Sequence, residues 1–473
     1  MAAERSEEDE IREVLKLFNV NKMKKEQREI LDTILKGKDC IAVLPTGYGK
    51  SLPYQTFLPI IRRLYPSRDT EKILVCCPLV SLMEDQVKRL ANLNCITTAY
   101  AGSDHCTDSL IKDGKIDIIF ASPETAVGDK AWREAIQQLQ ISLIVVDEFH
   151  TIATWGGLEK DEERNTFRKW FRHVGELRSL FPEAAMLALS ATCTKQILTR
   201  VVSVLGMDDC ETFITVSPNR ENIKYVVHQV DPSIECAMLW LLEGLGNLME
   251  TFPRTLIYCN SIKDVGHLYH FLVTELPDLV KYVEMFHSET MEDKKKEIVS
   301  KLSVDSELRV VISTSALGMG VDVSACQNII LYGPPYSIVD LLQETGRAGR
   351  DGTDSVALIM YNRYQTRNID DDVKQVIRSN SCRRLSIMDK FASAKHMQKI
   401  EKQTNLHTCC DICANFCKCN SCCVSPLEKL LHFSPLDDHD QQEESDSDTI
   451  SYEYESDHAD LENLDFDEEL IEL

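Results

Sequence analysis

Short apolar runs alternate with amphipathic stretches along most of this chain. Two stretches within residues 1–38, IREVLKLF and EQREILDTIL, place apolar residues at helical spacing. Runs rich in β-branched residues follow at 40–44, 72–78, 116–123, 143–148 and 186–192, with helical stretches between them. Strands that alternate with helices form βαβ units, so this pattern predicts a parallel sheet and the α/β class.

The alternation restarts after about residue 217. The second set of apolar runs lies at 222–227, 254–260, 282–288, 309–315 and 327–333. This repetition predicts a second α/β domain. The chain then changes character twice, because residues 376–424 are rich in cysteine and residues 425–473 are acidic and poor in apolar residues. We predict four parts: 1–217, 218–375, 376–424 and a disordered acidic tail at 425–473.

Composition narrows the class of protein further. A hydrophobic content of 43% with 27% charged residues is ordinary for a globular protein, and no apolar run is long enough to span a membrane, so we expect no membrane partner. The first ten residues, MAAERSEEDE, do not have the pattern of a secretory signal. We therefore expect the 18 cysteines to be thiols or metal ligands rather than disulfides.

The formal charge of −24 looks unfavourable for a partner that is a nucleic acid. Seventeen of the acidic residues lie in 437–473, however, so residues 1–429 carry a formal charge of only −7. The overall charge therefore says little about what the body of the chain binds. The tail is suited to a basic protein partner or to competition with DNA for a basic groove, and a solvated tail without either role is the simplest interpretation.

Residues 44–51, LPTGYGKS, have the composition of a phosphate-binding loop between a strand and a helix. Glycines let consecutive backbone N–H groups surround an anion, a lysine reaches the β- and γ-phosphates, and a serine hydroxyl holds Mg²⁺. The motif departs from the usual pattern at its first position, where Leu44 replaces glycine. The predicted nucleotide-binding residues of this loop are Thr46, Gly47, Gly49, Lys50 and Ser51.

Two further motifs supply charges that phosphoryl transfer needs. VVDEFH (145–150) ends a predicted strand with two carboxylates, of which Asp147 would hold the metal and Glu148 would orient or deprotonate a water. QETGRAGRDG (343–352) carries Arg347 and Arg350 in a glycine-rich turn. Arginine spreads phosphoryl charge through paired hydrogen bonds, so a finger from the second domain would link hydrolysis to domain closure.

Taken in order, nine motifs resemble those of the RecQ family of superfamily 2 DNA helicases, and the resemblance covers about residues 10–415. They are KKEQREI (24–30), LPTGYGKS (44–51), CPLVSLMEDQV (77–87), FASPE (120–124), DEFH (147–150), SAT (190–192), IYCNS (257–261), STSALGMGVD (313–322) and QETGRAGRDG (343–352). Phe149 stands where this family has alanine, and Tyr48 where it has glycine.

The resemblance implies two tandem RecA-like domains with ATP and Mg²⁺ between them, single-stranded DNA across both, and 3′ to 5′ travel. Gln27 would contact adenine, and Arg350 would be the arginine finger. The catalytic set that it implies is Lys50, Asp147, Glu148, His150, Gln343, Arg347 and Arg350. The implied DNA contacts are Ser81, Trp155, Phe167, Arg168, Ser190, Thr192, Asn260 and Thr314.

The segment WGGLEKDEERNTFRKWF (155–171) resembles the aromatic-rich loop of RecQ proteins, with about eight residues inserted between its matching parts. Aromatic side chains stack on bases at about 1–3 kcal/mol each, so the loop is suited to sensing DNA. Alternatively, Trp155, Phe167, Trp170 and Phe171 pack in a core.

The cysteine-rich region resembles the RecQ zinc-binding domain, which begins with the sequence CRR found here at 382–384. Cys382, His407, Cys410 and Cys413 form a Cys₃His set suited to structural Zn²⁺. Cys409 is an alternative to His407 as the fourth ligand. The four cysteines of CKCNSCC (417–423) leave two options open, a second metal site or a cysteine-rich end without metal.

The leading prediction is an ATP-dependent 3′–5′ DNA helicase or translocase in the nucleus, acting in DNA repair or recombination on single-stranded and tailed duplex DNA. The alternative from another class is an ATP-gated DNA-binding adaptor that does not couple hydrolysis to movement. An RNA helicase would share the motor motifs, and the zinc module favours DNA. Residues 425–473 are too few and too acidic for the winged-helix domain of many RecQ proteins, so processive unwinding is not predicted.

Overall fold

A computed structural model describes residues 6–155, 168–304, 306–318, 326–419 and 422 of the chain. The chain divides into two compact units, Met1–Leu431 and His432–Leu473, and every described residue belongs to the first. The predicted acidic tail therefore lies outside the described residues, as does Phe167. The four predicted domain boundaries stay a prediction.

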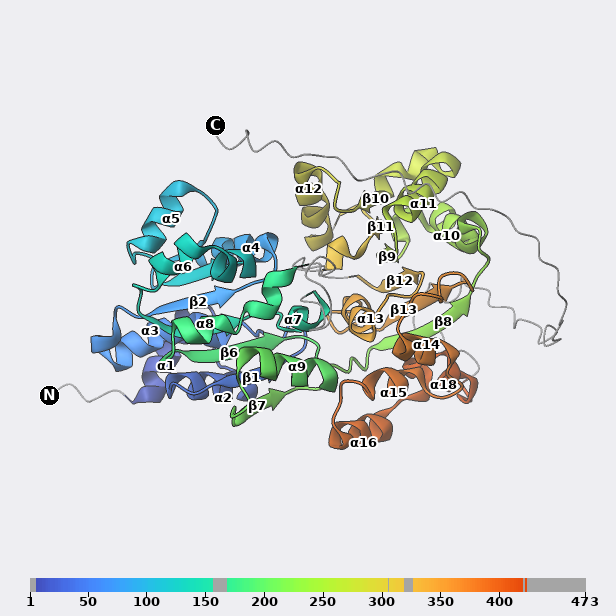
Figure 1. The fold of residues 1–473 in the computed structure, drawn as a ribbon. Coiled ribbons are helices and arrows are strands. Elements are labelled where there is room, and N and C mark those ends of the chain that lie inside the picture. The colour runs from blue at the N-terminus through green and yellow to red at the C-terminus, as the bar shows by residue number, and fades with distance from the viewer. Residues whose placement is uncertain (1–5, 156–167, 305, 319–325, 420–421, 423–473) are drawn as a thin grey trace, which may run out of the picture. The chain divides into compact units, whose positions relative to one another are not determined.

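The first sheet has seven parallel strands in the order β3-β4-β2-β5-β6-β1-β7. Figure 1 labels β2, β6, β1 and β7 of this sheet. Five strands of the sheet coincide with the predicted runs. The strands are β1 (Cys40–Val43), β2 (Lys72–Cys76), β3 (Thr98–Tyr100), β4 (Ile118–Ala121), β5 (Ile141–Val146), β6 (Ala185–Ser190) and β7 (Thr212–Thr215).

Alternate side chains of a strand point to opposite faces of the sheet, and in this sheet both sets are apolar. Helices therefore cover both faces and bury them. In β1, Ile41 and Val43 belong to one apolar core, while Cys40 and Ala42 belong to the other. The second core is completed by the first three helices. The helices of this region are α1 (Glu7–Leu17), α2 (Lys25–Leu35), α3 (Leu52–Leu64), α4 (Val80–Leu90), α5 (His105–Lys112), α6 (Lys130–Ile136), α7 (His150–Thr154), α8 (Glu176–Leu180) and α9 (Lys195–Leu205).

The second sheet has six parallel strands in the order β10-β11-β9-β12-β13-β8. They are β8 (Ile223–Gln229), β9 (Thr255–Cys259), β10 (Val283–Phe286), β11 (Val310–Ser313), β12 (Asn328–Tyr332) and β13 (Ser355–Tyr361). Its helices are α10 (Ile234–Leu248), α11 (Ile262–Glu275), α12 (Glu292–Ser303), α13 (Ile338–Thr345) and α14 (Asp371–Arg378). The two parallel-sheet domains confirm the predicted α/β fold class.

Four short helices follow the second sheet domain: α15 (Arg383–Met388), α16 (Ala394–Gln403), α17 (Leu406–Cys409) and α18 (Asp411–Asn415). Cys409 lies on α17 and Cys413 on α18, while Cys382 and Cys410 directly precede α15 and α18. Cys410 forms an isolated parallel bridge with Tyr225 of β8, which joins this helical module to the edge of the second sheet. None of the helices in the described part of the chain has the length and apolar character needed to cross a membrane.

Candidate active site

Three neighbouring strands of the first sheet end at one edge and bring the ATPase motifs together. Val43, the last residue of β1, pairs with Ser190 of β6, and Ala188 of β6 pairs with Val146 of β5. The loop 44–51, the SAT motif and the acidic pair therefore start side by side. The carboxyl ends of parallel strands are the usual place for a ligand in this type of sheet.

The loop 44–51 has a backbone that only glycine adopts easily. Gly47 and Gly49 have φ angles of +77° and +85°, in the left-handed region. Leu44 is fully buried, and its N–H donates to the carbonyl of Ser190 over 3.0 Å, so it continues the strand. Position 44 belongs to the strand and the core rather than to the turn. This explains why it can be leucine where the phosphate-binding motif usually has glycine. Thr46, Gly47 and Gly49 are exposed, which leaves the loop open to an anion.

Gln27, the expected adenine contact, lies against this loop. Its Nε2 donates to the carbonyls of Tyr48 and Gly49 over 3.0 and 2.9 Å, and its Oε1 accepts from the N–H of Lys24 over 2.8 Å. Tyr48 donates its hydroxyl to Glu26 over 2.5 Å, and the Lys24 ammonium lies 3.9 Å from the centre of its ring. The tyrosine that replaces a family glycine therefore fastens the loop to α2.

Lys50, Glu148 and His150 form a chain of side-chain contacts beneath the loop. Lys50 Nζ lies 3.3 Å from Glu148 Oε1, and His150 Nδ1 lies 3.3 Å from Glu148 Oε2. Burial alone would raise the pKa of Glu148, but the charge of Lys50 and the close contact with His150 outweigh it and lower that pKa. Glu148 is ionised at neutral pH, and it holds a left-handed backbone with φ +49°.

Asp147 behaves in the opposite way. Burial and the adjacent charge of Glu148 raise the pKa of Asp147 to about 6. Its Oδ1 accepts the N–H of Glu148 over 2.9 Å. Two carboxyls with pKa values pushed apart are suited to separate roles, one as a metal ligand and one as a base. Ser51, which precedes α3, and Asp147 are the oxygen donors that fit Mg²⁺ here.

His150 and Gln343 connect the two sheet domains. Gln343 Nε2, on α13, lies 3.0 Å from His150 Nε2 and donates to Thr192 Oγ1 over 3.1 Å. Ser190 Oγ lies 2.9 Å from His150 Nδ1. Because the amide of Gln343 donates to Nε2, this arrangement assigns the imidazole proton to Nδ1. A change at Gln343 can therefore reach Glu148 through one imidazole ring.

Ser190 and Thr192 were expected to contact DNA. Both are buried, and Ser190 Oγ donates to the carbonyl of Thr192 over 2.8 Å. The structure places their side chains against His150 and Gln343 rather than in the groove described below. Their position favours a role in transmitting strand contact to the ATPase site.

Arg347 and Arg350 lie in a turn after α13 that is held by the start of β8. Gly349 has φ +51°, and a Cβ there would lie 2.5 Å from Asn222 Nδ2. The Gly349 carbonyl accepts hydrogen bonds from Arg220 and from Asn222. Arg347 is buried and Arg350 is half-buried. The turn that Gly349 allows therefore fixes the backbone positions from which the side chains of Arg347 and Arg350 extend.

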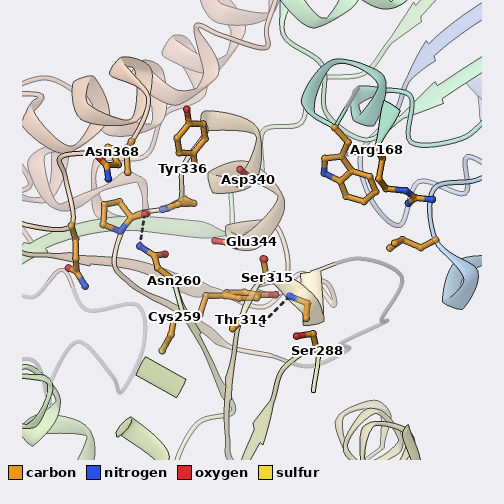
Figure 2. Close-up of a pocket in the computed structure, with 18 of the residues that line it drawn as sticks. Arg168, Cys259, Asn260, Ser288, Thr314, Ser315, Tyr336, Asp340, Glu344 and Asn368 are labelled. Carbon is orange, nitrogen blue, oxygen red and sulfur yellow. Dashed lines mark hydrogen bonds between the residues drawn. The ribbon is translucent and has the colours of Figure 1, made fainter. Parts of the chain in front are cut away.

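A groove of about 1100 Å³ collects five of the eight expected DNA contacts, as Figure 2 shows for several of them. The five are Ser81, Trp155, Arg168, Asn260 and Thr314. Asn260 follows β9 and Thr314 follows β11, so both stand at the carboxyl edge of the second sheet. The Asn260 amide donates to the carbonyl of Pro334 over 3.3 Å.

Sequence reasoning missed two tyrosines of this groove. Tyr336 and Tyr364 line it and are 65% and 64% exposed, although tyrosine is usually more buried. The Arg367 guanidinium lies 5.1 Å from the centre of the Tyr364 ring. Exposed aromatic rings beside arginine are suited to stacking on bases. The PPY sequence after β12 was the available signal for Tyr336.

Arg168 organises the aromatic segment. Its guanidinium pairs with the Glu124 carboxylate through two hydrogen bonds, donates to the carbonyl of Pro78, and lies 4.6 Å from the Phe171 ring centre. Trp155 packs edge-on against Phe171 at 5.4 Å. The Arg168 N–H also donates to the Trp155 carbonyl over 3.2 Å, so the two ends of segment 156–167 are tied together.

The two interpretations of this segment therefore divide between its residues. Phe171 is buried, and Trp170 packs on Gly128, where a Cβ would lie 2.7 Å from the indole. Trp155 is half-buried and lines the groove. Packing accounts for the rings of Phe171 and Trp170, and among the described rings of this segment Trp155 is the one that lines the groove.

The cysteines form two groups in the described part of the chain. Cys382, Cys409, Cys410 and Cys413 have their sulfur atoms within 4.8 Å of one another. The expected set is corrected at one position, because Cys409 takes the place given to His407. The physical reason is that Cys410 is extended, with φ −160° and ψ 171°, between α17 and α18, which lets the adjacent Cys409 face the same point.

The arginines of the CRR sequence hold this module on the second sheet domain. Arg383 Nε lies 2.7 and 2.9 Å from the two carboxylate oxygens of Asp411, and its Nη1 donates to the carbonyls of Val376 and Ile377. Arg384 is 3% exposed and donates to the carbonyls of Arg220 and Ile223. The cysteine module is therefore fixed by buried charge-assisted hydrogen bonds.

Two family models match the chain. The model described as DEAD/DEAH box helicase matches residues 24–200, and that described as Helicase conserved C-terminal domain matches residues 238–352. The first match covers the phosphate loop and the acidic pair, and the second covers the arginine turn. The first matched segment contains β1 to β6 of the first sheet, and the second contains β9 to β12 of the second sheet.

Curated relatives extend the similarity over most of the chain. ATP-dependent DNA helicase Q1 of Pongo abelii is 28% identical over 428 residues, which are 86% of this chain and 62% of that protein. ATP-dependent DNA helicase RecQ of Pasteurella multocida (strain Pm70) is 28% identical, over 84% of this chain and 61% of the relative. The chain thus spans less than two thirds of their length. The structure of S. cerevisiae Dbp5 bound to RNA and ADP BeF3 matches with a TM-score of 0.59 at 16% identity, over 78% of this chain and 91% of Dbp5, which supports the fold.

Proposed function

Because the chain belongs to the RecQ family of superfamily 2 helicases, we propose that it is an ATP-dependent DNA helicase or translocase that moves 3′ to 5′ on single-stranded DNA. The observation that carries the proposal is the continuous set of contacts from Lys50 through Glu148 and His150 to Gln343. It joins a phosphate-binding loop on one sheet domain to a motif on the other.

The residues have separate roles in hydrolysis. Lys50 leaves Glu148 to bind the β- and γ-phosphates of ATP, and the freed carboxylate accepts a proton from the attacking water. Before ATP binds, the charge of Lys50 and the contact with His150 outweigh burial and lower the pKa of Glu148, so the carboxylate is already ionised when Lys50 moves to the phosphates. Ser51 and Asp147 would hold Mg²⁺, which neutralises phosphate charge when it is bound. Arg350, with Arg347 behind it, would stabilise charge on the transferred phosphoryl group.

Gln343 couples this chemistry to the strand. DNA in the groove would contact Ser81 from the first domain and Asn260 and Thr314 from the second, with bases against Trp155 and Tyr336. Asp340 and Glu344 of α13 line the groove, so a strand that widens or narrows it would move the helix that carries Gln343 and change the hydrogen bond to His150. Hydrolysis then depends on occupancy of the groove.

A structural zinc ion completes the proposed architecture. Cys382, Cys409, Cys410 and Cys413 form a closed Cys₄ set, which is typical of structural rather than catalytic zinc. Their place beside β8 makes the ion a support for the second sheet domain. We place the protein in the nucleus, in repair or recombination, because its proposed substrate is DNA, and we assign the tail to a basic protein partner.

The alternative, an ATP-gated DNA binder without movement, draws on the Arg168 contacts. That arginine of the sensing segment already pairs with Glu124 in the chain itself. If the pair persists on DNA, binding would not be signalled through the segment. The two functions differ in whether DNA accelerates ATP turnover.

The test is steady-state ATP hydrolysis with and without single-stranded DNA, followed by strand displacement on 3′-tailed and 5′-tailed duplexes. We expect DNA to stimulate turnover, Lys50→Ala to abolish it, and displacement to require the 3′ tail. Lys38→Ala, which changes an exposed lysine paired with Glu211, is the matched control and should behave as wild type. Turnover that DNA leaves unchanged would refute coupling and support the ATP-gated binder.

A further inference from the structure

A second group of metal-ligand side chains lies beside the Cys₄ set. It consists of His407, Cys417, Cys419 and Cys422, whose ligand atoms all lie within 4.8 Å of one another. His407 Nδ1 is 3.1 Å from Cys419 Sγ, and Cys419 Sγ is 3.1 Å from Cys422 Sγ. Cys423, the last residue of the cysteine-rich run, lies outside the described residues.

These separations suit a tetrahedral ion. Zinc binds sulfur at about 2.3 Å and nitrogen at about 2.0 Å, so the ligand atoms of such a site stand roughly 3.5–3.8 Å apart. The group therefore needs only small shifts to enclose one ion. The ligand spacing is also suitable, because a C-x-C-x-x-C segment presents three thiolates and the histidine comes from a separate helical turn.

We propose that His407, Cys417, Cys419 and Cys422 form a second structural zinc site of the Cys₃His type. It is separate from the Cys₄ site, because the two groups share no ligand. This assignment also gives His407 a role, since the first site excludes it.

The surrounding contacts position this second site independently of any ion. Asn405 Oδ1 accepts the N–H of His407 over 3.0 Å and so fixes the start of α17. The Cys422 carbonyl accepts a hydrogen bond from Lys224 of β8. Cys422 Sγ lies 3.7 Å from the carbonyl of Ala414. His407 is therefore held on α17, and Cys422 is held against α18 and β8 of the second sheet.

The two sites share one short helix. His407 and Cys409 both lie on α17 but belong to different groups, and Cys413 and Cys417 flank the end of α18 in the same way. An ion in one site orders the helix that supplies the other. The module would then hold two zinc ions per chain, and loss of the second should weaken retention of the first.

The experiment measures zinc in the purified full chain by mass spectrometry and by release to a colorimetric chelator. We expect two ions per chain for wild type and about one for Cys417→Ser, Cys419→Ser and Cys422→Ser. Cys106→Ser and Cys236→Ser, at exposed cysteines outside both groups, are matched controls that should keep two. Circular dichroism and thermal melting establish that each variant is folded.

Histidine supplies a second, spectroscopic test. In the Co²⁺-substituted full chain, His407→Cys should retain two metal ions and convert the mixed spectrum of a Cys₄ and a Cys₃His site into that of two Cys₄ sites. His407→Ala should lower the metal content. The proposal is overturned if wild type holds one ion, if the Cys417→Ser and Cys419→Ser variants keep two, or if Cys423→Ser rather than Cys422→Ser removes the second.

Discussion

Glu344 offers a prediction that does not depend on the proposed activity. This carboxyl is 8% exposed and stands in the wall of the groove, as Figure 2 shows. Burial, with a smaller contribution from Asp340, raises its pKa from 4.5 to about 8, although Arg347 acts in the opposite direction. The folded chain therefore keeps this carboxyl protonated at neutral pH, whereas the unfolded chain ionises it.

The sign and size of the effect follow from proton binding. Below about pH 4.5 both states hold the proton, and between about pH 4.5 and pH 8 only the folded state holds it, so stability falls as pH rises. Above about pH 8 both states are ionised and the loss stops. Between about pH 6 and pH 9 the group costs about 2.5 kcal/mol of unfolding free energy. For domains of this size that is roughly 5–10 °C in Tm.

The assay is the melting temperature of wild type and Glu344→Gln across this pH range. We expect the variant, which cannot ionise, to melt increasingly above wild type as pH rises. Glu250→Gln replaces an exposed carboxyl of the same sheet domain and is the matched control, for which the curve should follow wild type. A wild-type minus Glu344→Gln difference that is constant with pH would refute the argument.

Three further substitutions test other contacts. Gln343→Ala removes two neutral hydrogen bonds, at about 1 kcal/mol each, so stimulation of ATP turnover by DNA should fall about 30-fold, and retained stimulation would remove Gln343 from the coupling path. Arg383→Ala removes the cation that pairs with Asp411 and should lower the free energy of unfolding, measured in denaturant, by about 3–5 kcal/mol. A decrease below about 1 kcal/mol would show that the ion pair does not stabilise the fold. Gly49→Ala places a Cβ 2.6 Å from Gln27 Nε2 at a φ of +85°, so binding of a fluorescent ATP analogue should weaken at least tenfold; unchanged binding would show that the loop relaxes freely.

Much of the fold follows from patterns that depend on burial alone. The strands at 40–43 and 141–146 are short, lie between helical stretches and are apolar at every position except Ser142, as expected of strands covered on both faces. Three strands escaped the same reasoning. Thr98–Tyr100 and Thr212–Thr215 lie at the two edges of the first sheet, and each has only one buried residue. Ser355–Tyr361 is an apolar run that periodicity cannot distinguish from a buried helix.

The site was predictable where its chemistry needs a local motif. Lys50 and Glu148 each follow a strand of the first sheet, and the strands of a parallel sheet end at the same edge. Recognising the two motifs was therefore enough to predict that these side chains lie close together. The exchange of Cys409 for His407 depended on the extended backbone at Cys410, for which ligand spacing gives no signal. The phenylalanine at position 149, where the family has alanine, was likewise explained only by the structure, in which its ring is fully buried in the apolar core.

The backbone hydrogen bond between Trp155 and Arg168 makes this position a natural insertion point for protein engineering. The segment between them starts and ends at a fixed pair, so its length can change while the aromatic contacts of Arg168 stay in place. Doubling a loop costs only about 0.6 kcal/mol in closure entropy. A reporter peptide or small binding domain inserted between Trp155 and Arg168 would therefore be anchored at two residues that line the groove, and its signal would report on what occupies that groove.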